Sequence, residues 1–359
     1  MNNLSAKPQI MKRVNSALIK DSLKNNGSAT KAEISEITGI SITTIRTLIE
    51  ELLLKKEIIS LGFDDSSGGR RAERYSLNLD YNNALSFYIK DGYINYAITN
   101  LLGNIIEENK VKIYSEFNEK IIEDFIDNVV IESFIYNIVK DRDIKAIGIG
   151  VPGVVENGTF FSGKGLNDWR KFELGDYIQK KLGIPVVLEN DLNSMALGFS
   201  LNYSQSIEVL DIEKLNLVYI HFTEAGVGAG IIANGQLIRG GNNFAGELGF
   251  LPINSMGHLE KVLDNNIDDD TYVDIISQTI AILNCVTNPS FIVIGGETLR
   301  KNLIEKIRNT CEKYLANNIK PTILLSEDSE RDYLTGIAYI TSEFMYSDIK
   351  ITKNWLSVY

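Results

Sequence analysis

The stretch from Thr30 to Thr47 constrains the fold of this chain most, because it carries the start and stop signals of two short helices. Thr30 followed by Glu33 is a capping-box pattern, in which the two side chains satisfy free backbone N–H groups at a helix start. Gly39 can end that helix, and Ser41 can begin another. The apolar residues of the second helix recur at i, i+3, i+4 and i+7, at Ile45, Leu48, Ile49 and Leu52. The stretch therefore predicts a helix-turn-helix.

The outer face of the second predicted helix carries short hydroxyl side chains and one arginine: Ser41, Thr43, Thr44 and Arg46. Such side chains suit the major groove of DNA, where base edges present hydrogen-bond donors and acceptors. An ordinary helical hairpin with a polar outer face has the same pattern, and the pattern alone does not separate the two interpretations.

The residues around this stretch predict a small domain over residues 1–80. Residues 9–25 read as a first helix, and two β-type runs at 57–63 and 74–79 enclose a turn-rich segment, with Arg70, Arg71 and Arg74 at or beside its tip. This arrangement predicts a winged helix-turn-helix whose arginines reach phosphates or a narrow minor groove. Residues 1–78 hold twelve Lys/Arg against nine Asp/Glu, a charge of +3, whereas the whole chain carries −11. Only the first domain therefore favours phosphates.

The remaining sequence alternates strands, helices and glycine-rich loops, and a chain of 359 residues usually forms more than one domain. We expect a first lobe at 81–190, rejoined by a C-terminal helix at about 330–359, and a second lobe at 191–329. An amphipathic helix is expected at 119–140, and a glycine-rich turn is expected before a strand at 230–233. Strands that end in such loops place a ligand site at their carboxyl ends, here between the lobes.

Several classes of protein are disfavoured by composition. No apolar run approaches the ~20 residues that a membrane helix needs, and the first residues lack the apolar stretch of a secretory signal. We therefore expect a cytoplasmic protein. The two cysteines, Cys285 and Cys311, argue against a disulfide framework and lack a zinc-binding spacing.

Four blocks, in this order along the chain, resemble the ROK family, which is named for repressors, open reading frames and kinases. They are VPGVVENG at 151–158, LENDLNSMALG at 188–198, AGVGAGIIANGQLIRGGNNFAGELG at 225–249 and NPSFIVIGG at 288–296. Together with GGRRAERY at the wing, they resemble the repressor branch of the family. This resemblance implies an α/β fold, in which a two-lobed actin-like or sugar-kinase-like domain follows the winged helix-turn-helix.

The resemblance also implies a sugar-binding site between the lobes. In the family, the residues that match Asn190, Asp191, Glu247 and Glu260 contact sugar hydroxyls. In the kinases, the residue that matches Asp191 is the general base for the attacked hydroxyl. Without the family match, Asn190 and Asp191 would read as a strand-end turn in which Asp191 caps the next helix.

Two departures from the family pattern argue against ATP and zinc. The kinases hold phosphates with an Asp-x-Gly-Gly-Thr hairpin, and the matching residues here, Tyr88 to Gly92, lack that pattern. The second phosphate loop reads Glu224-Ala225-Gly226, so a carboxylate would face polyphosphate. Many relatives also bind zinc through one histidine and three cysteines, but Phe250 replaces the histidine and the cysteines are absent. We expect no ATP, no metal and no cofactor.

We therefore predict a sugar-responsive DNA-binding regulator of carbohydrate metabolism, most simply a repressor and not an enzyme. A homodimer, or a higher homo-oligomer, would bind a palindromic double-stranded operator. One alternative is a carbohydrate kinase with an accessory DNA-binding domain. Another is a ligand-free dimeric DNA-binding protein derived from the same fold.

Overall fold

A computed structural model describes residues 6–64, 71–90, 92–112, 129–156, 158–162, 170–206, 214–224, 226–253, 256–264, 267–316 and 319–346. At the N-terminal end, three helices pack on a sheet of strand order β1-β3-β2. These elements are α1 (Ala6–Asn26), β1 (Ala29–Thr30), α2 (Lys31–Thr38), α3 (Ile42–Leu54), β2 (Ile58–Phe63) and β3 (Glu73–Leu77).

The helix signals between Thr30 and Thr47 act as predicted. The Thr30 hydroxyl accepts the Glu33 N–H at 3.3 Å, and the Glu33 carboxylate accepts the Thr30 N–H at 2.7 Å. Gly39 ends α2 with a left-handed φ of 71°, and Ser41 Oγ accepts the Thr44 N–H at 3.3 Å to begin α3. The predicted apolar face of α3 is buried in the core of this N-terminal domain.

The N-terminal domain is docked on the rest of the molecule. Leu101, from the turn after β5, is buried in the same core, and Leu102 and Met345 pack against that core. Lys24 of α1 forms an ion pair with Glu343, which lies in the last described helix of the chain. The domain therefore shares apolar and ionic contacts with residues that follow it by tens to hundreds of positions.

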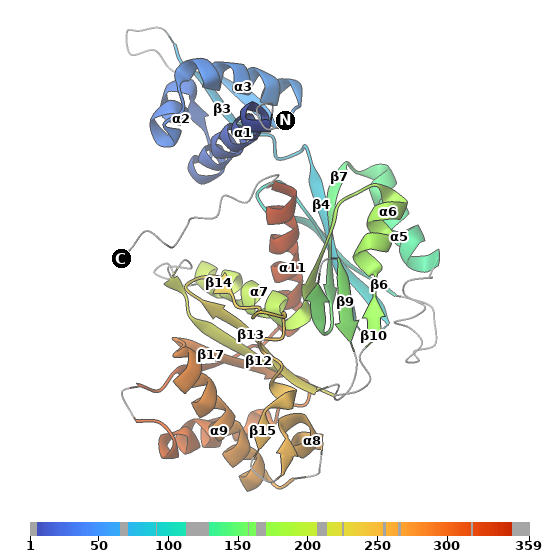
Figure 1. The fold of residues 1–359 in the computed structure, drawn as a ribbon, viewed down its shortest axis with the longest axis vertical. Coiled ribbons are helices and arrows are strands. Elements are labelled where there is room, and N and C mark those ends of the chain that lie inside the picture. The colour runs from blue at the N-terminus through green and yellow to red at the C-terminus, as the bar shows by residue number, and fades with distance from the viewer. Residues whose placement is uncertain are drawn as a thin grey trace.

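The first lobe is built on a five-stranded sheet of order β11-β7-β4-β5-β6, beside a small antiparallel sheet β10-β9-β8. Helices α5 and α6 lie on one side of the large sheet and α11 on the other (Figure 1). The elements are β4 (Asn83–Lys90), β5 (Tyr93–Thr99), β6 (Ile105–Lys112), α5 (Val129–Asp141), β7 (Ile144–Val151), β8 (Val154–Glu156), β9 (Thr159–Ser162), β10 (Arg170–Phe172), α6 (Leu174–Leu182), β11 (Val186–Asn190) and α11 (Ser329–Tyr346).

The second lobe repeats the arrangement with a sheet of order β14-β13-β12-β17-β18, and α7 and α9 lie on opposite faces (Figure 1). Its helices are α7 (Asp191–Ser206), η2 (Leu248–Phe250), α8 (Leu259–Asp264), α9 (Asp269–Thr287), η3 (Lys301–Leu303), α10 (Ile304–Thr310) and η4 (Cys311–Lys313). Its strands are β12 (Leu217–Thr223), β13 (Gly226–Ala233), β14 (Gln236–Leu237), β15 (Pro252–Ile253), β16 (Gly257–His258), β17 (Phe291–Gly296) and β18 (Thr322–Leu325).

Two predicted elements differ from the structure. The expected glycine-rich turn before residue 230 is wrong, because β13 already begins at Gly226. Its glycines allow α7 to approach, since a Cβ on Gly230 would lie 2.2 Å from the Leu192 carbonyl oxygen. The helix expected at 119–140 is seen as α5 from Val129, and its earlier part lies outside the described residues.

Helices α7 and α11 cross in close backbone contact at the junction of the lobes (Figure 1). A Cβ on Gly198 would lie 1.7 Å from the Asp332 carbonyl oxygen, and a Cβ on Gly336 would lie 1.8 Å from that of Ser194. These two positions therefore require glycine.

Among the described residues, none of the helices has the length and apolar character required to cross a membrane.

The contact between β7 and α11 gives a test of packing in the first lobe. A Cβ on Gly148 would lie 1.7 Å from Thr341 Oγ1 and 2.8 Å from Thr341 Cβ, so Gly148→Ala must displace α11. We expect this change to lower the free energy of unfolding by about 1–3 kcal/mol, measured by urea denaturation. Gly241→Ala, with no atom within 4 Å of the added Cβ, is the control and should change it by less than about 0.5 kcal/mol. Equal effects of the two changes would contradict this packing.

Candidate functional site

Three of the predicted sugar-binding residues come together where the lobes meet. Asp191 is the first residue of α7, directly after β11, and Glu247 precedes the short helix η2. Glu260 lies in the first turn of α8, and its carboxylate lies over Gly226 and Gly249. The charges of Asp191 and Glu260 both act on Glu247, so the three carboxylates form one acidic cluster.

Burial sets the protonation of this acidic cluster. Desolvation raises the pKa of Asp191 to about 6, although the Leu192 N–H donates to Asp191 Oδ1 at 2.9 Å and opposes the shift. Burial also raises the pKa of Glu247 to about 7, and the like charges of Asp191 and Glu260 add to the shift. Protonated and ionised carboxyl groups together can donate to and accept from hydroxyl groups of a ligand.

Asn190 differs from the carboxylates because its side chain is engaged within the protein. Its Nδ2 donates to the Gly153 carbonyl at 2.8 Å, and its Oδ1 accepts the Asn193 N–H at 3.0 Å. Asn190 therefore caps α7 and ties it to the loop after β7, whereas the strand-end interpretation had placed the cap at Asp191. Any contact of Asn190 with a ligand would require one of these bonds to be shared or broken.

Glu189 and Tyr333 lie close to Asp191 of the acidic cluster, and the sequence interpretation did not assign them a role. Glu189 is buried, accepts Asn193 Nδ2 at 2.9 Å and forms an ion pair with Arg239. Burial raises the pKa of Tyr333 of α11, and the nearby charges of Asp191 and Glu189 add to the shift. Glu189 lies in the block at 188–198 and Arg239 in the block at 225–249. Their positions within these blocks were the signal by which the sequence could have identified them.

Side chains of the protein fill the region that matches the first phosphate loop. The Tyr88 ring is buried and stacks on the Tyr333 ring with centroids 4.0 Å apart. Lys90 forms ion pairs with Glu297 of the second lobe and with Glu330 of α11 at 3.7 Å. An aromatic stack and an ion pair between the lobes thus lie in the segment that matches the first phosphate loop of the kinases.

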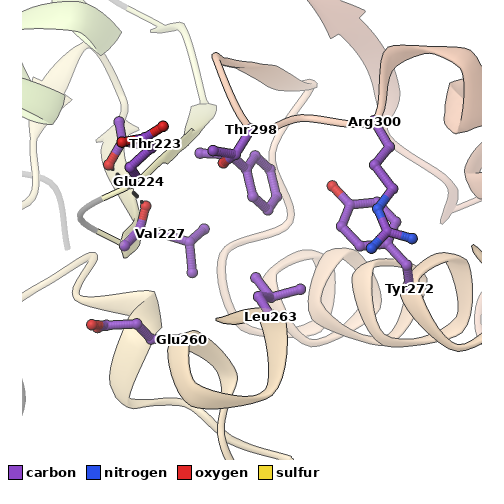
Figure 2. Close-up of a pocket in the computed structure, with 10 residues that line it drawn as sticks. Thr223, Glu224, Val227, Glu260, Leu263, Tyr272, Thr298 and Arg300 are labelled. Atoms are coloured by element: carbon purple, nitrogen blue, oxygen red, sulfur yellow. Dashed lines mark hydrogen bonds between the residues drawn. The ribbon is translucent and has the colours of Figure 1, made fainter. Parts of the chain in front are cut away.

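A pocket of about 140 Å³ opens in the second lobe beside Glu260 (Figure 2). Its apolar wall is formed by Phe222, Val227 and Leu263, and its polar groups include Thr223, Glu224 and Thr298. Glu224 brings a carboxylate to the second phosphate loop, which disfavours polyphosphate there. The pocket was not predicted from the sequence.

Some of the predicted DNA-contacting residues are exposed to solvent, whereas others form hydrogen bonds within the protein. Thr43 and Arg46 project from α3 into solvent, and Arg71 is exposed at the start of the segment that leads into β3. Ser41 caps α3, and its Oγ lies 2.9 Å from Thr44 Oγ1, so these two hydroxyls already interact. Arg70 lies outside the described residues.

Arg74, expected beside the wing tip as a phosphate contact, has a different role. Its guanidinium donates to Asp64 at 2.9 Å and to Glu33 at 3.2 Å, so it joins the β2–β3 hairpin to α2. Two carboxylates already neutralise its charge. The prediction that Arg74 is available to DNA is therefore wrong.

The region that matches the family zinc loop carries aromatic side chains. Phe250 lies 5.4 Å from Phe244 between ring centroids, and the exposed His258 shares a hydrogen bond of 3.0 Å between Nδ1 and the Phe250 carbonyl oxygen. Within the described parts of the chain, no group of three or more His, Cys, Asp or Glu side chains could hold a metal ion.

Comparison with known proteins shows similarity to one family. Residues 91–261 match the ROK family model. The xylose repressor of Caldicellulosiruptor bescii is 29% identical over 249 residues, which cover 68% of this chain and 60% of the repressor. This chain therefore spans less than two thirds of that relative's length.

Solved structures share the fold. A ROK family transcriptional regulator, described as a homologue of the Escherichia coli MLC protein, superposes with a TM-score of 0.69 at 21% identity, covering 94% of this chain and 97% of its own. A ROK family glucokinase from Streptomyces griseus superposes with a TM-score of 0.52 at 19% identity, covering 73% of this chain and 99% of its own. The two-lobed part thus has the actin-like, sugar-kinase-like α/β fold that the sequence predicted.

The acidic cluster predicts a specific pH dependence of stability. Because the folded-state pKa values of Asp191 and Glu247 lie above their ordinary values, the stability that their protonated forms contribute is present below about pH 4.5. It is lost as pH rises through about 6 to 7. Glu247→Gln should reduce this loss between pH 5 and pH 8 by about 1–2 kcal/mol, measured by urea unfolding at each pH. Glu36→Gln, on the exposed side of α2, should leave it unchanged. An identical pH dependence in Glu247→Gln and the native protein would contradict the buried cluster.

Proposed function

We propose that this chain, which carries a domain of the ROK family, is a sugar-responsive DNA-binding transcriptional repressor of carbohydrate metabolism. In this proposal the N-terminal domain is a winged helix-turn-helix, and a sugar binds between the lobes at Asp191, Glu247 and Glu260. The protein does not act as a kinase. The name of the relative makes xylose the first sugar to test.

The observation that carries the proposal is the exposed polar face of α3. The apolar face formed by Ile45, Leu48, Ile49 and Leu52 is buried in the N-terminal core. Thr43, Arg46 and Thr47 are therefore exposed to solvent on a positively charged domain. The solved glucokinase covers 73% of this chain and the solved regulator 94%. The difference is about a fifth of the chain, which is the size of the N-terminal domain. The fold thus supports the interpretation that a DNA-binding domain precedes a sugar-kinase-like domain.

A sugar could control DNA binding through the junction of the lobes. Allosteric control requires the ligand to bind one arrangement of the protein better than another. The acidic cluster draws Asp191 from the junction and Glu247 and Glu260 from the second lobe, so a ligand held by all three favours one lobe arrangement. In a homodimer this would change the spacing of the two α3 helices on a palindromic operator.

A sugar kinase is the competing function, and one observation favours it. Asp191 lies at the position of the family's general base, and its pKa near 6 suits proton abstraction near neutral pH. The Tyr88–Tyr333 stack and the Lys90–Glu297 ion pair argue against it, because both would have to move before phosphates could bind.

ATP turnover separates the two functions. We expect no sugar-dependent ADP release with xylose, glucose or their amino derivatives, measured by a coupled assay with magnesium. Sugar-dependent ADP release that disappears in Asp191→Asn would establish the kinase and overturn the proposal.

DNA binding can be tested at single arginines with a duplex selected by the full-length protein from random sequences. Arg46→Ala should weaken binding about tenfold, because a side chain on a base edge contributes about 1–3 kcal/mol. Arg71→Ala should reduce the slope of log affinity against log salt by about one, since one phosphate contact is lost. Fluorescence anisotropy measures both, and Lys301→Ala, exposed on the second lobe, is the control. Weak binding of duplex DNA that is insensitive to salt would contradict this assignment.

A further inference from the structure

The pocket in Figure 2 shares one side chain, Glu260, with the acidic cluster. The stem of Glu260 lines the pocket, whereas its carboxylate points away from Leu263 and Tyr272 in Figure 2 and acts on Glu247. Gly226 lines the same pocket and lies directly against the Glu260 carboxylate. The pocket and the cluster are therefore adjacent parts of one site.

A buried hydroxyl group indicates that the pocket receives a polar ligand. Tyr272 of α9 is 4% exposed, and its buried Oη makes no hydrogen bond of normal geometry with the described residues, although the Arg300 backbone N–H is close enough to oppose the rise in its pKa that burial causes. A buried hydroxyl without a partner costs about 1–3 kcal/mol, so a ligand that completes the bond recovers that energy. Figure 2 shows this hydroxyl directed into the pocket. The Arg300 guanidinium lies 4.6 Å from the Tyr272 ring centroid and donates to Asp269, which holds the ring in place.

The remaining lining residues select the chemistry of that ligand. Phe222, Val227 and Leu263 provide apolar surface, and Thr223 and Thr298 add hydroxyl groups, of which the Thr223 hydroxyl also donates to the Gly226 carbonyl oxygen at 3.1 Å. A ring that is apolar on one face and carries hydroxyls at its edge matches both. Glu224 and Glu260 disfavour phosphate and other anions, because the arginine in the lining is already paired with Asp269. About 140 Å³ is close to the cavity size that accepts one six-membered ring.

We propose that this pocket is a second sugar subsite, so that the effector is a neutral disaccharide or similar glycoside rather than a monosaccharide. One ring binds at Asp191, Glu247 and Glu260, and the linked ring or aglycone enters the pocket and bonds with Tyr272 Oη. This inference rests on the proposed sugar-sensing function and specifies the class of its ligand.

Calorimetry on the full chain tests this with xylose and glucose against xylobiose, cellobiose and the 1,6-linked gentiobiose. At least one disaccharide should bind ten times more tightly than its monosaccharide. Tyr272→Phe should weaken disaccharide binding about fivefold, the value of one hydrogen bond, and leave monosaccharide binding unchanged. Tyr314→Phe, whose hydroxyl bonds with Asp274 on the surface of the same lobe, is the matched control and should change neither. Glucose 6-phosphate should not bind.

The outcomes separate this inference from the function on which it rests. Monosaccharide binding with no gain for any disaccharide, or an equal loss of both in Tyr272→Phe, overturns the second subsite and leaves the sugar sensor intact. Adenosine binding that depends on Tyr272, with no disaccharide binding, also overturns it in favour of a nucleoside. If no sugar of either size binds, both the subsite and the sugar-sensing function are wrong, whereas operator binding still tests the DNA-binding part.

Discussion

The backbone contact between α7 and α11 is the constraint on which the two-lobed part of this protein depends. Because Gly198 and Gly336 lack side chains, each helix approaches the other's carbonyl groups directly, and the crossing leaves little freedom to slide. Asp191 begins the first of these helices, and Tyr333 lies in the second. The positions of Asp191 and Tyr333 are therefore fixed by the same contact that joins the lobes, so a change in the angle between the helices also moves these two residues.

The site has carboxylates at the positions that match the family's sugar-binding residues. Beside them, side chains of the protein occupy the region that matches the first phosphate loop of the kinases. The Tyr88–Tyr333 stack is buried, and Lys90 satisfies its charge with Glu297 and Glu330. These contacts join the first lobe to the second and to α11 through the protein's own side chains.

Local features of the fold could be predicted from the sequence, whereas contacts between distant residues could not. The capping box of Thr30 and Glu33 involves residues three positions apart, so the pattern determines the geometry. The glycines of β13 read as a turn because their role depends on α7, which packs on them. Arg74 read as a free charge because its partners Glu33 and Asp64 come from other elements. For the site, family resemblance supplied the three carboxylates, but the partnerless Tyr272 hydroxyl depends on burial, which no spacing reveals.

The docking of the N-terminal domain has a consequence for how strictly DNA could be read. Leu101, Met345 and the Lys24–Glu343 ion pair hold this domain on the first lobe and α11, so its orientation is fixed when the chain folds. A DNA-binding domain on a flexible linker can bind half-sites at many separations, but it loses orientational entropy on binding. In the proposed dimer, two DNA-binding domains of fixed orientation avoid that loss. A single base pair inserted between the half-sites would rotate one half-site relative to the other by about a tenth of a DNA turn. The operator would then be defined by its helical phase as much as by its bases.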